Sequence, residues 1–276
     1  MKIFQLVFMM FFVVLSTQLT AQIYQKVSDA GTVNWQDQII RATGIGSPNP
    51  QVPLAAQRAG AIRAAQMDAL RQMLETVKGM SLTSETTVRN AMIENDVIES
   101  KVSGVVKNFR KVETRYLSDG SVEVDVEMPL SGILLDAILP QQVGGMTPGG
   151  LNYGVAPQPS FTNSVITGII IDARGLGLRP AMAPKVLDEN GNEVYGTGYV
   201  SREYAVQIGV VGYEKDINRA KNDDRVKDNA AVVKALRVSG TNQSDVVISN
   251  ADASNIQAAG KNLNFMEQCK VMFILD

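Results

Sequence analysis

The sequence of 276 residues contains no histidine and one cysteine, Cys269. Ser-His-Asp and Cys-His catalysis, histidine zinc sites and cysteine-rich metal clusters need residues that this chain lacks. A single cysteine also cannot form an intramolecular disulfide, so in an oxidising compartment the chain depends on core packing or assembly for its stability. Cys269 lies in an apolar segment, which favours a buried thiol over a nucleophile.

An excess of charge of one sign is also absent. The chain has 26 Lys and Arg against 28 Asp and Glu, a net charge of -2, which leaves no electrostatic footprint for nucleic acid or for an anionic membrane surface. We therefore expect no nucleic-acid partner. Since no residue pattern selects a catalytic pair, a cofactor or a metal, we also expect that the protein is not an enzyme and has no cofactor and no metal site.

Long apolar runs are limited to the N-terminus. Lys2 precedes an apolar run from Ile3 to Leu15 that only Gln5 interrupts, and a polar stretch then leads to Ala21. The run is shorter than the ~20 residues of a transmembrane helix, which is typical of a secretory signal peptide, here residues 1–21. An uncleaved anchor is the alternative. We expect an exported protein, in the periplasm or at the outer membrane, with no transmembrane segment after cleavage.

A second compositional feature divides the rest of the chain. Residues 140–160 are rich in glycine and proline and carry no charge, as is typical of a linker. They predict an N-terminal domain over residues 22–139 and a C-terminal domain over residues 161–276. Both are within the usual size range for one hydrophobic core.

The N-terminal domain contains one strong helical pattern. Apolar residues recur at helical spacing over residues 52–78, and Gly79 supplies a stop. Alanines dominate the first two thirds of this segment, so we expect a neighbouring element to approach it closely. Residues 102–109 predict a strand that leads into a sheet.

A hairpin follows in the same domain. Residues 111–117 and 122–128 both alternate in hydrophobicity, and the Asp119-Gly120 turn between them favours positive φ. The acidic residues of the second segment lie on the face opposite its valines, which favours a solvated sheet face over an acidic binding surface. These residues are Glu123, Asp125 and Glu127.

The C-terminal domain combines strand and helix patterns. A hairpin is predicted around the turn at residues 189–191, and a short helix over residues 251–259. Strands are predicted at 164–171, 231–238, 245–249 and 269–275, residues 199–213 are expected to supply a strand and its flanks, and part of 214–228 is expected to be helical. The fold class is therefore α+β, with a helix packed on a small antiparallel sheet and linked to a second, mixed α/β domain.

The most pointed cluster of polar residues follows the predicted strand at 164–171. Ligands of α/β sheets often bind beyond the carboxyl ends of strands, and glycines let backbone N–H groups approach an anion. We take this loop as a candidate ligand or anion site. The alternative is a structural turn held by an ion pair. The candidate residues are Asp172, Arg174, Gly175, Gly177 and Arg179.

Several motifs of the first domain resemble the twenty-kilodalton outer-membrane lipoprotein family. They are Gln57-Arg58-Ala59-Gly60-Ala61 through Lys78-Gly79-Met80, Ser103-Gly104-Val105-Val106-Lys107 and the hairpin at 116–124. The resemblance covers roughly residues 50–130 and implies a helix packed on a small antiparallel sheet. The family includes envelope proteins of the flagellar P type, which assemble as rings or disks around the motor base. This chain lacks the family's lipid-bearing cysteine.

The second domain carries a weaker likeness. Residues 168–182 and 250–253 are similar to segments of exported bacterial proteins of unassigned function that have the same N-terminal domain. From both halves we expect a non-enzymatic envelope protein that forms a homo-oligomer or docks into an outer-membrane-associated assembly, for which the family suggests a flagellar setting. If the apolar strand at 269–275 lies at a sheet edge, it can pair with a strand of a neighbouring molecule. The alternative is a periplasmic protein that binds a small ligand or anion through residues 172–179.

Overall fold

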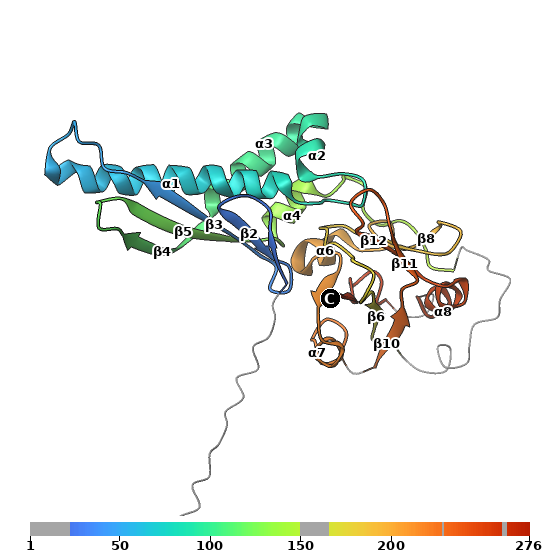
Figure 1. The fold of residues 1–276 in the computed structure, drawn as a ribbon. Coiled ribbons are helices and arrows are strands. Elements are labelled where there is room, and N and C mark those ends of the chain that lie inside the picture. The colour runs from blue at the N-terminus through green and yellow to red at the C-terminus, as the bar shows by residue number, and fades with distance from the viewer. Residues whose placement is uncertain (1–22, 150–165, 228, 261–263) are drawn as a thin grey trace, which may run out of the picture.

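The computed structural model describes residues 23–149, 166–227, 229–260 and 264–276. The predicted signal peptide, residues 150–160 of the predicted linker and the first two residues of the strand predicted at 164–171 lie outside these residues. The described residues form two bodies, an elongated N-terminal domain and a C-terminal domain at one end of it (Figure 1). No helix in the described part of the chain has the length and hydropathy needed to cross a membrane.

The N-terminal domain contains a long helix packed on an antiparallel sheet, as predicted, and the sheet has five strands. The antiparallel sheet has the strand order β1-β2-β3-β5-β4, and helix α1 lies along one face of it (Figure 1). The elements are β1 (Tyr24–Lys26), β2 (Gly31–Asn34), β3 (Ile39–Gly46), α1 (Leu54–Gly79), α2 (Val88–Glu94), α3 (Asp96–Val105), the 3-10 turn η1 (Val106–Asn108), β4 (Arg110–Tyr116), β5 (Val122–Pro129) and α4 (Ile133–Ile138).

Helix α1 approaches strand β3 closely because small residues meet at the contact. A Cβ atom added to Gly44 would lie 2.1 Å from the backbone nitrogen of Ala69, and one on Gly46 would lie 2.1 Å from the carbonyl oxygen of Ala61. Ala61, Ala65 and Ala69 are fully buried. The close approach expected from the alanines is therefore confirmed, and β3 is the neighbour that makes it.

The opposite face of the antiparallel sheet carries the acidic residues of β5, and these have basic partners. Arg115 contacts Glu123, with 3.0 Å between Nε and Oε2, and also pairs with Asp125. The Nε atom of Arg41 lies 3.4 Å from Oε2 of Glu127. Because the carboxylates are neutralised within their own sheet, this face supports the solvated interpretation over an acidic binding surface.

Two sequence predictions for this domain were wrong or incomplete. Residues 102–109 form the end of α3 and the turn η1 instead of a strand. The side chain of Asn95 caps α3 by accepting from the backbone nitrogens of Val97 and Ile98, and the helix then buries Val102 and Val106, which are one helical turn apart. Strands β1 to β3, over residues 24–46, were not predicted.

The C-terminal domain contains a parallel sheet and a smaller mixed sheet. The parallel sheet has the order β10-β6-β13-β9 and the mixed sheet the order β11-β12-β7-β8. The elements are β6 (Gly168–Asp172), β7 (Val186–Leu187), β8 (Glu193–Tyr195), α6 (Arg202–Ile208), β9 (Gly212–Glu214), α7 (Ile217–Lys221), β10 (Ala230–Lys234), β11 (Arg237–Ser239), β12 (Asp245–Val247), α8 (Asn250–Gly260) and β13 (Val271–Ile274).

The terminal strand is not available for pairing with another molecule. Strand β13 lies between β6 and β9 and pairs with both, so the expectation that it could lie at a sheet edge was wrong. The segment 199–213, predicted to supply a strand and its flanks, contains helix α6, which is followed by Gly209 with a φ of +83°, and its last two residues begin β9. Gly144 and Met146, in the predicted linker, donate backbone hydrogen bonds to the carbonyls of Thr197 and Gly198.

Candidate functional site

The loop predicted as a ligand site follows β6 at the carboxyl end of the parallel sheet. Asp172 is the last residue of β6, which has β10 and β13 on either side. The strands of a parallel sheet all present their carboxyl ends at one edge, where α/β proteins commonly bind ligands. Strands β9, β10 and β13 end at the same edge, in Glu214, Lys234 and Ile274.

Asp172 and Arg174 form a two-pronged ion pair at this edge. Arg174 donates from Nε to Oδ1 of Asp172 at 2.8 Å and from Nη2 to Oδ2 at 2.5 Å. The hydrogen bonds from Arg174 lower the pKa of the Asp172 carboxyl group, and Asp172 in turn raises the pKa of Arg174. Both charges therefore have a partner within the loop.

The other three predicted residues do not converge on the ion pair. Gly175 and Gly177 adopt φ values of +79° and +69°, and an added Cβ would meet open space at either position, so positive φ is what the glycines provide. The backbone nitrogen of Gly175 donates to Oδ1 of Asp276 at 2.6 Å. Arg179 donates its backbone N–H to Gln243 and has an exposed side chain. This geometry is that of a turn held by an ion pair, and anion binding by the loop stays a prediction.

The cysteine is buried, as expected from its apolar segment. Burial raises the pKa of the Cys269 thiol to about 12, which keeps it protonated and weakly nucleophilic at neutral pH. Within the described residues no group of three or more Asp, Glu or Cys side chains is placed to hold a metal ion.

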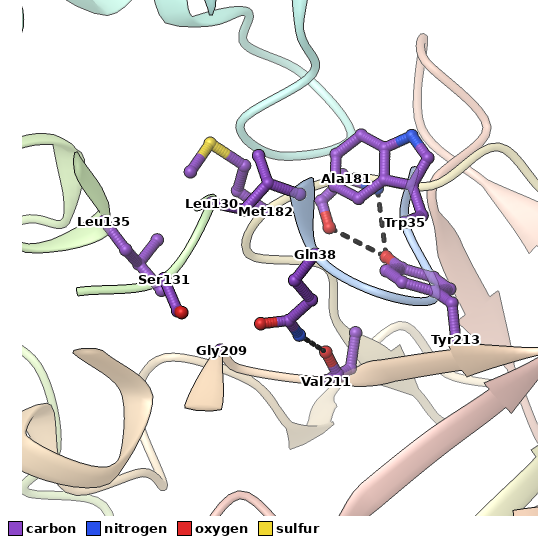
Figure 2. Close-up of a pocket in the computed structure, with 10 residues that line it drawn as sticks. All are labelled: Trp35, Gln38, Leu130, Ser131, Leu135, Ala181, Met182, Gly209, Val211 and Tyr213. Carbon is purple, nitrogen blue, oxygen red and sulfur yellow. Dashed lines mark hydrogen bonds between the residues drawn. The ribbon is translucent and has the colours of Figure 1, made fainter. Parts of the chain in front are cut away.

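A site that the sequence did not indicate lies where the two domains meet (Figure 2). The turn between β2 and β3 inserts Trp35 against Tyr213 of β9, with ring centroids 5.7 Å apart in an edge-to-face arrangement. The hydroxyl of Tyr213 donates to the carbonyl of Ala181 and accepts from its N–H. Gln38, which adopts a left-handed φ of +54°, donates from Nε2 to the carbonyls of Ile208 at 3.0 Å and Val211 at 3.4 Å.

The space between these side chains is small. The cavity among Trp35, Gln38 and Tyr213 has a volume of 20 Å³, enough for about one water molecule. A wider, open groove of 840 Å³ lies beside it, between Gln36 of the N-terminal domain and Arg219 and Arg225 of the C-terminal domain. The Oε1 atom of Gln36 is buried with no hydrogen-bond partner among the described residues.

Arg225 fills a structural position beside this groove. Its guanidinium group donates from Nη1 to the carbonyls of Gly209 at 3.1 Å and Cys269 at 2.8 Å, and from Nη2 to the carbonyl of Ile208. These bonds satisfy carbonyl groups at the end of α6. Burial lowers the pKa of Arg225. The arginine therefore joins the end of α6 to Cys269, two residues before β13, and its Nη1 and Nη2 groups are engaged by the protein itself.

A loop after α1 forms the second contact between the domains. Ser84 donates from Oγ to Oδ2 of Asp245 at 2.5 Å, and its carbonyl accepts from the backbone nitrogen of Asn242 at 2.7 Å. Met182 donates its backbone N–H to the carbonyl of Ser81 at 3.0 Å. Gly240 permits this contact, because a Cβ there would lie 2.2 Å from Cβ of Ser84. Hydrogen bonds between polar groups of both domains thus hold the domain junction together, and the one between Ser84 and Asp245 is buried.

Comparisons with known proteins follow the same division. Residues 36–128 match the family model of the LPP20 lipoprotein. The predicted resemblance is confirmed for the N-terminal domain. The LPP20 match begins at Gln36, directly after Trp35, and ends within β5, so it includes β3, α1 and β4 and leaves β1 and β2 outside. It supports an exported protein with an envelope-type localisation.

The second domain has a match of its own. Residues 168–276 match the model of the second domain of Tp0624 from Treponema pallidum. This match begins with β6 and continues to the end of the chain, so it contains the parallel sheet, the mixed sheet and the loop at 172–179. No curated protein matches the chain.

Proposed function

We propose that this protein is a non-enzymatic component of the cell envelope that acts by self-association or by docking into an envelope assembly through its N-terminal domain. The likeness to flagellar P-type envelope proteins makes a flagellar assembly one setting for this role. A non-enzymatic role is supported by the buried cysteine and by the internal pairing of Asp172 with Arg174.

The observation that carries the proposal is the distribution of exposed apolar side chains. Of the 14 large hydrophobic residues exposed among the described residues, ten lie in the N-terminal domain. Clusters of exposed apolar side chains on a soluble protein often mark sites of contact with another molecule. The ten are Tyr24, Ile45, Leu54, Met67, Ile93, Val97, Val112, Tyr116, Leu117 and Ile133.

Strand β4 is the part of this surface best suited to pairing with another chain. It forms one edge of the antiparallel sheet, and within the described residues it pairs only with β5. Val112 lies at a register shift between Lys111 and Glu113, where it has no partner residue on β5, and it is 48% exposed. An unpaired edge strand offers backbone N–H and C=O groups to a strand of a second molecule, and the apolar side chain would add a contact.

The test is the solution mass of the chain from Gln22 onward, measured by light scattering together with negative-stain imaging. We expect oligomers such as rings in the unmodified protein. Val112→Lys should reduce the oligomer to smaller species, because a lysine at an edge strand opposes pairing. The matched control is Val232→Lys, which places the same charge at a valine of similar exposure, 41%, on the edge strand β10 of the C-terminal domain.

The outcomes separate the two domains. Loss of the oligomer with Val112→Lys alone supports the N-terminal edge, and loss with Val232→Lys alone would assign the contact to the parallel sheet instead. A monomer for the unmodified chain at high concentration would contradict self-association. Circular dichroism of both variants checks that they remain folded, which is expected because both side chains are solvent-exposed.

A further inference from the structure

Strand β4 lies at an edge of the antiparallel sheet (Figure 1). Its pairing with β5 is irregular between Lys111 and Glu113, and from Glu113 to Tyr116 each residue has one partner on β5. Helix α1 packs mainly on β3 and β5, which lie further inside the sheet. The regular part of β4 is therefore the stretch that a second strand can approach.

The free edge of this stretch carries the backbone groups of alternate residues. The N–H of Leu117 donates to the carbonyl of Ser121 at 2.9 Å, so the backbone groups of Leu117 face the β5 side. Successive residues of an antiparallel strand direct these groups to opposite edges. The N–H and C=O groups of Thr114 and Tyr116 therefore point away from β5, where a strand of a second molecule can bond to them.

The side chains of this stretch divide between the two faces of the sheet. Tyr116 lies on the α1 side, because the guanidinium carbon of Arg58 in α1 is 4.1 Å from the centre of its ring. Thr114 lies on the same side by alternation. Glu113 and Arg115 lie on the open face, with 3.1 Å between Oε2 and Nη1. The charged side chains of residues 112–116 are therefore all on the open face.

An antiparallel second copy of β4 could pair in several registers, which differ in the residue at the two-fold axis. Centring on Glu113 places two glutamates directly opposite each other, and centring on Arg115 does the same with two arginines. Like charges at directly opposite positions are unfavourable. Centring on Thr114 instead places Glu113 of each chain opposite Arg115 of the other, and symmetry repeats this pair. The charges therefore favour Thr114 at the axis.

Glu113 can accept this second cation. Its side chain is 59% exposed, and Arg115 of its own chain is shared with two further carboxylates, Glu123 and Asp125. Both of these lie on β5, one strand further from the free edge. The group of a second copy that lies directly opposite Glu113 in this register is therefore the guanidinium of Arg115.

The same register matches side chains on the α1 side. Val112 of each chain would lie opposite Tyr116 of the other, and these side chains are 48% and 53% exposed. Pairs of an aromatic and a β-branched residue are favourable across strands. The Thr114 hydroxyl is buried and has no hydrogen-bond partner among the described residues. Two Thr114 side chains meet at the axis, where a rotation about χ1 lets one hydroxyl donate to the other.

We propose that two copies of the chain join through β4 as an antiparallel pair with Thr114 at the two-fold axis. This inference rests on the proposed self-association and adds its register and symmetry. A two-fold contact uses the same surface of both copies and closes on itself. The two five-stranded sheets become one continuous sheet, and a larger assembly such as a ring would be built from these pairs through another surface.

Disulfide crosslinking tests the register, with the chain from Gln22 onward under mild oxidation. Thr114→Cys should form a covalent dimer, because opposite residues of a hydrogen-bonded pair lie about 5.5 Å apart at Cα, within the range of a disulfide. Val112→Cys and Tyr116→Cys should each fail to crosslink alone, and should crosslink after the two are mixed and allowed to exchange. The unmodified chain is the control for Cys269, which is buried.

A charge reversal tests the match on the open face. Glu113→Lys places a lysine opposite Arg115 of the partner twice in each pair, so the dissociation constant should rise about tenfold. Light scattering over a dilution series measures it. The matched control is Glu94→Lys, which makes the same change at an exposed carboxylate of α2 in the same domain and should leave the dissociation constant unchanged. Circular dichroism checks that both variants are folded.

The outcomes separate this register from self-association in general. A covalent dimer of Val112→Cys or Tyr116→Cys alone, or no crosslink in any variant, would overturn the register, and so would equal losses in Glu113→Lys and Glu94→Lys. If the unmodified chain still forms oligomers in those cases, self-association stands and the β4 pair alone fails. A monomeric unmodified chain at high concentration would contradict both.

Discussion

The two main sheets of the molecule bury their side chains in different ways. In the parallel sheet, consecutive residues Ile169, Ile170 and Ile171 of β6 are all buried, because α7 covers one face and the main core of the protein covers the other. In the antiparallel sheet, Val124 of β5 is buried under α1 while the neighbouring Glu123 pairs with an arginine on the open face. A sheet covered on both faces needs a continuous apolar run, and a sheet covered on one face needs alternation.

The helix contacts differ as well. Helix α1 meets β3 through glycine and alanine, so backbone atoms of the two elements nearly touch. Where helix α7 meets the parallel sheet, Ala220 of the helix packs among the larger side chains of Ile170, Met272 and Ile274 of the sheet. The first contact should therefore be sensitive to added volume, and the second to lost volume.

The largest effect is expected where volume is added under α1. Gly44→Val would place a branched side chain where a single Cβ is already 2.1 Å from the backbone of Ala69. Backbone atoms of a long helix cannot move aside locally, so we expect the free energy of unfolding to fall by more than about 3 kcal/mol, at or above the upper range for overpacked cores. Urea denaturation followed by circular dichroism and by Trp35 fluorescence measures the change.

The control is a substitution at a second glycine, which lies in α1 but makes no close contact. Gly60 lies within α1, is exposed, and an added Cβ would have no neighbour within 4 Å. Gly60→Ala should stabilise the protein by about 0.5–1 kcal/mol, the usual gain from replacing glycine inside a helix. If Gly44→Val were as well tolerated as Gly60→Ala, the close contact of α1 with β3 would be wrong.

An intermediate effect is expected where volume is removed from the parallel sheet. Ile170→Ala should lower the free energy of unfolding by about 2–5 kcal/mol, because the side chain is fully buried beneath α7 and its loss leaves a cavity. Ile45→Ala, on the exposed antiparallel sheet, should change it by no more than about 0.5 kcal/mol. Equal losses of unfolding free energy in the two variants, measured by urea denaturation, would contradict our conclusion. They would mean that the parallel sheet, covered on both faces, and the antiparallel sheet, covered on one, do not differ in burial.

The sequence predicted the parts of the fold whose signal is local. The Asp119-Gly120 turn between two alternating segments gave the β4–β5 hairpin, and Gly120 indeed has positive φ. The alanine-rich segment gave α1 and its close packing. The segment at 102–109 was mistaken for a strand because valines favour strands, although Val102 and Val106 have helical spacing and Asn95 supplies a cap.

The site was harder to predict, because it depends on contacts between distant residues. The loop at 172–179 was placed correctly after a buried strand, but sequence spacing could not show whether Asp172 and Arg174 would face a ligand or each other. The domain junction brings Trp35 to Tyr213 and Ser84 to Asp245, residues separated by more than 150 positions. The clearest local signal was Trp35, since the only tryptophan of a chain is rarely left without a packing partner.

The smallest expected effect is the pH dependence of stability that two aspartates contribute. Hydrogen bonds from Arg115 lower the pKa of Asp125 on the open sheet face, whereas burial raises the pKa of Asp245 at the domain junction. Asp125 therefore adds stability above its unfolded pKa of about 3.9, and this contribution disappears as pH falls through its lower folded value. The contribution of Asp245 depends on pH in the opposite direction. It is greatest below pH ~4 and is lost as the pH rises through the raised folded pKa of this residue.

Two isosteric variants make this contrast measurable. The unmodified protein should exceed Asp125→Asn in free energy of unfolding by about 1 kcal/mol or less at pH 7, and the gap should begin to narrow as the pH falls below ~4. Against Asp245→Asn the gap should instead be larger at pH 4 than at pH 7. Urea denaturation between pH 3.5 and 7.5 tests both slopes. Parallel slopes would mean that Asp245 is solvated, and hence that the Ser84 contact does not exclude water from the junction of the two domains.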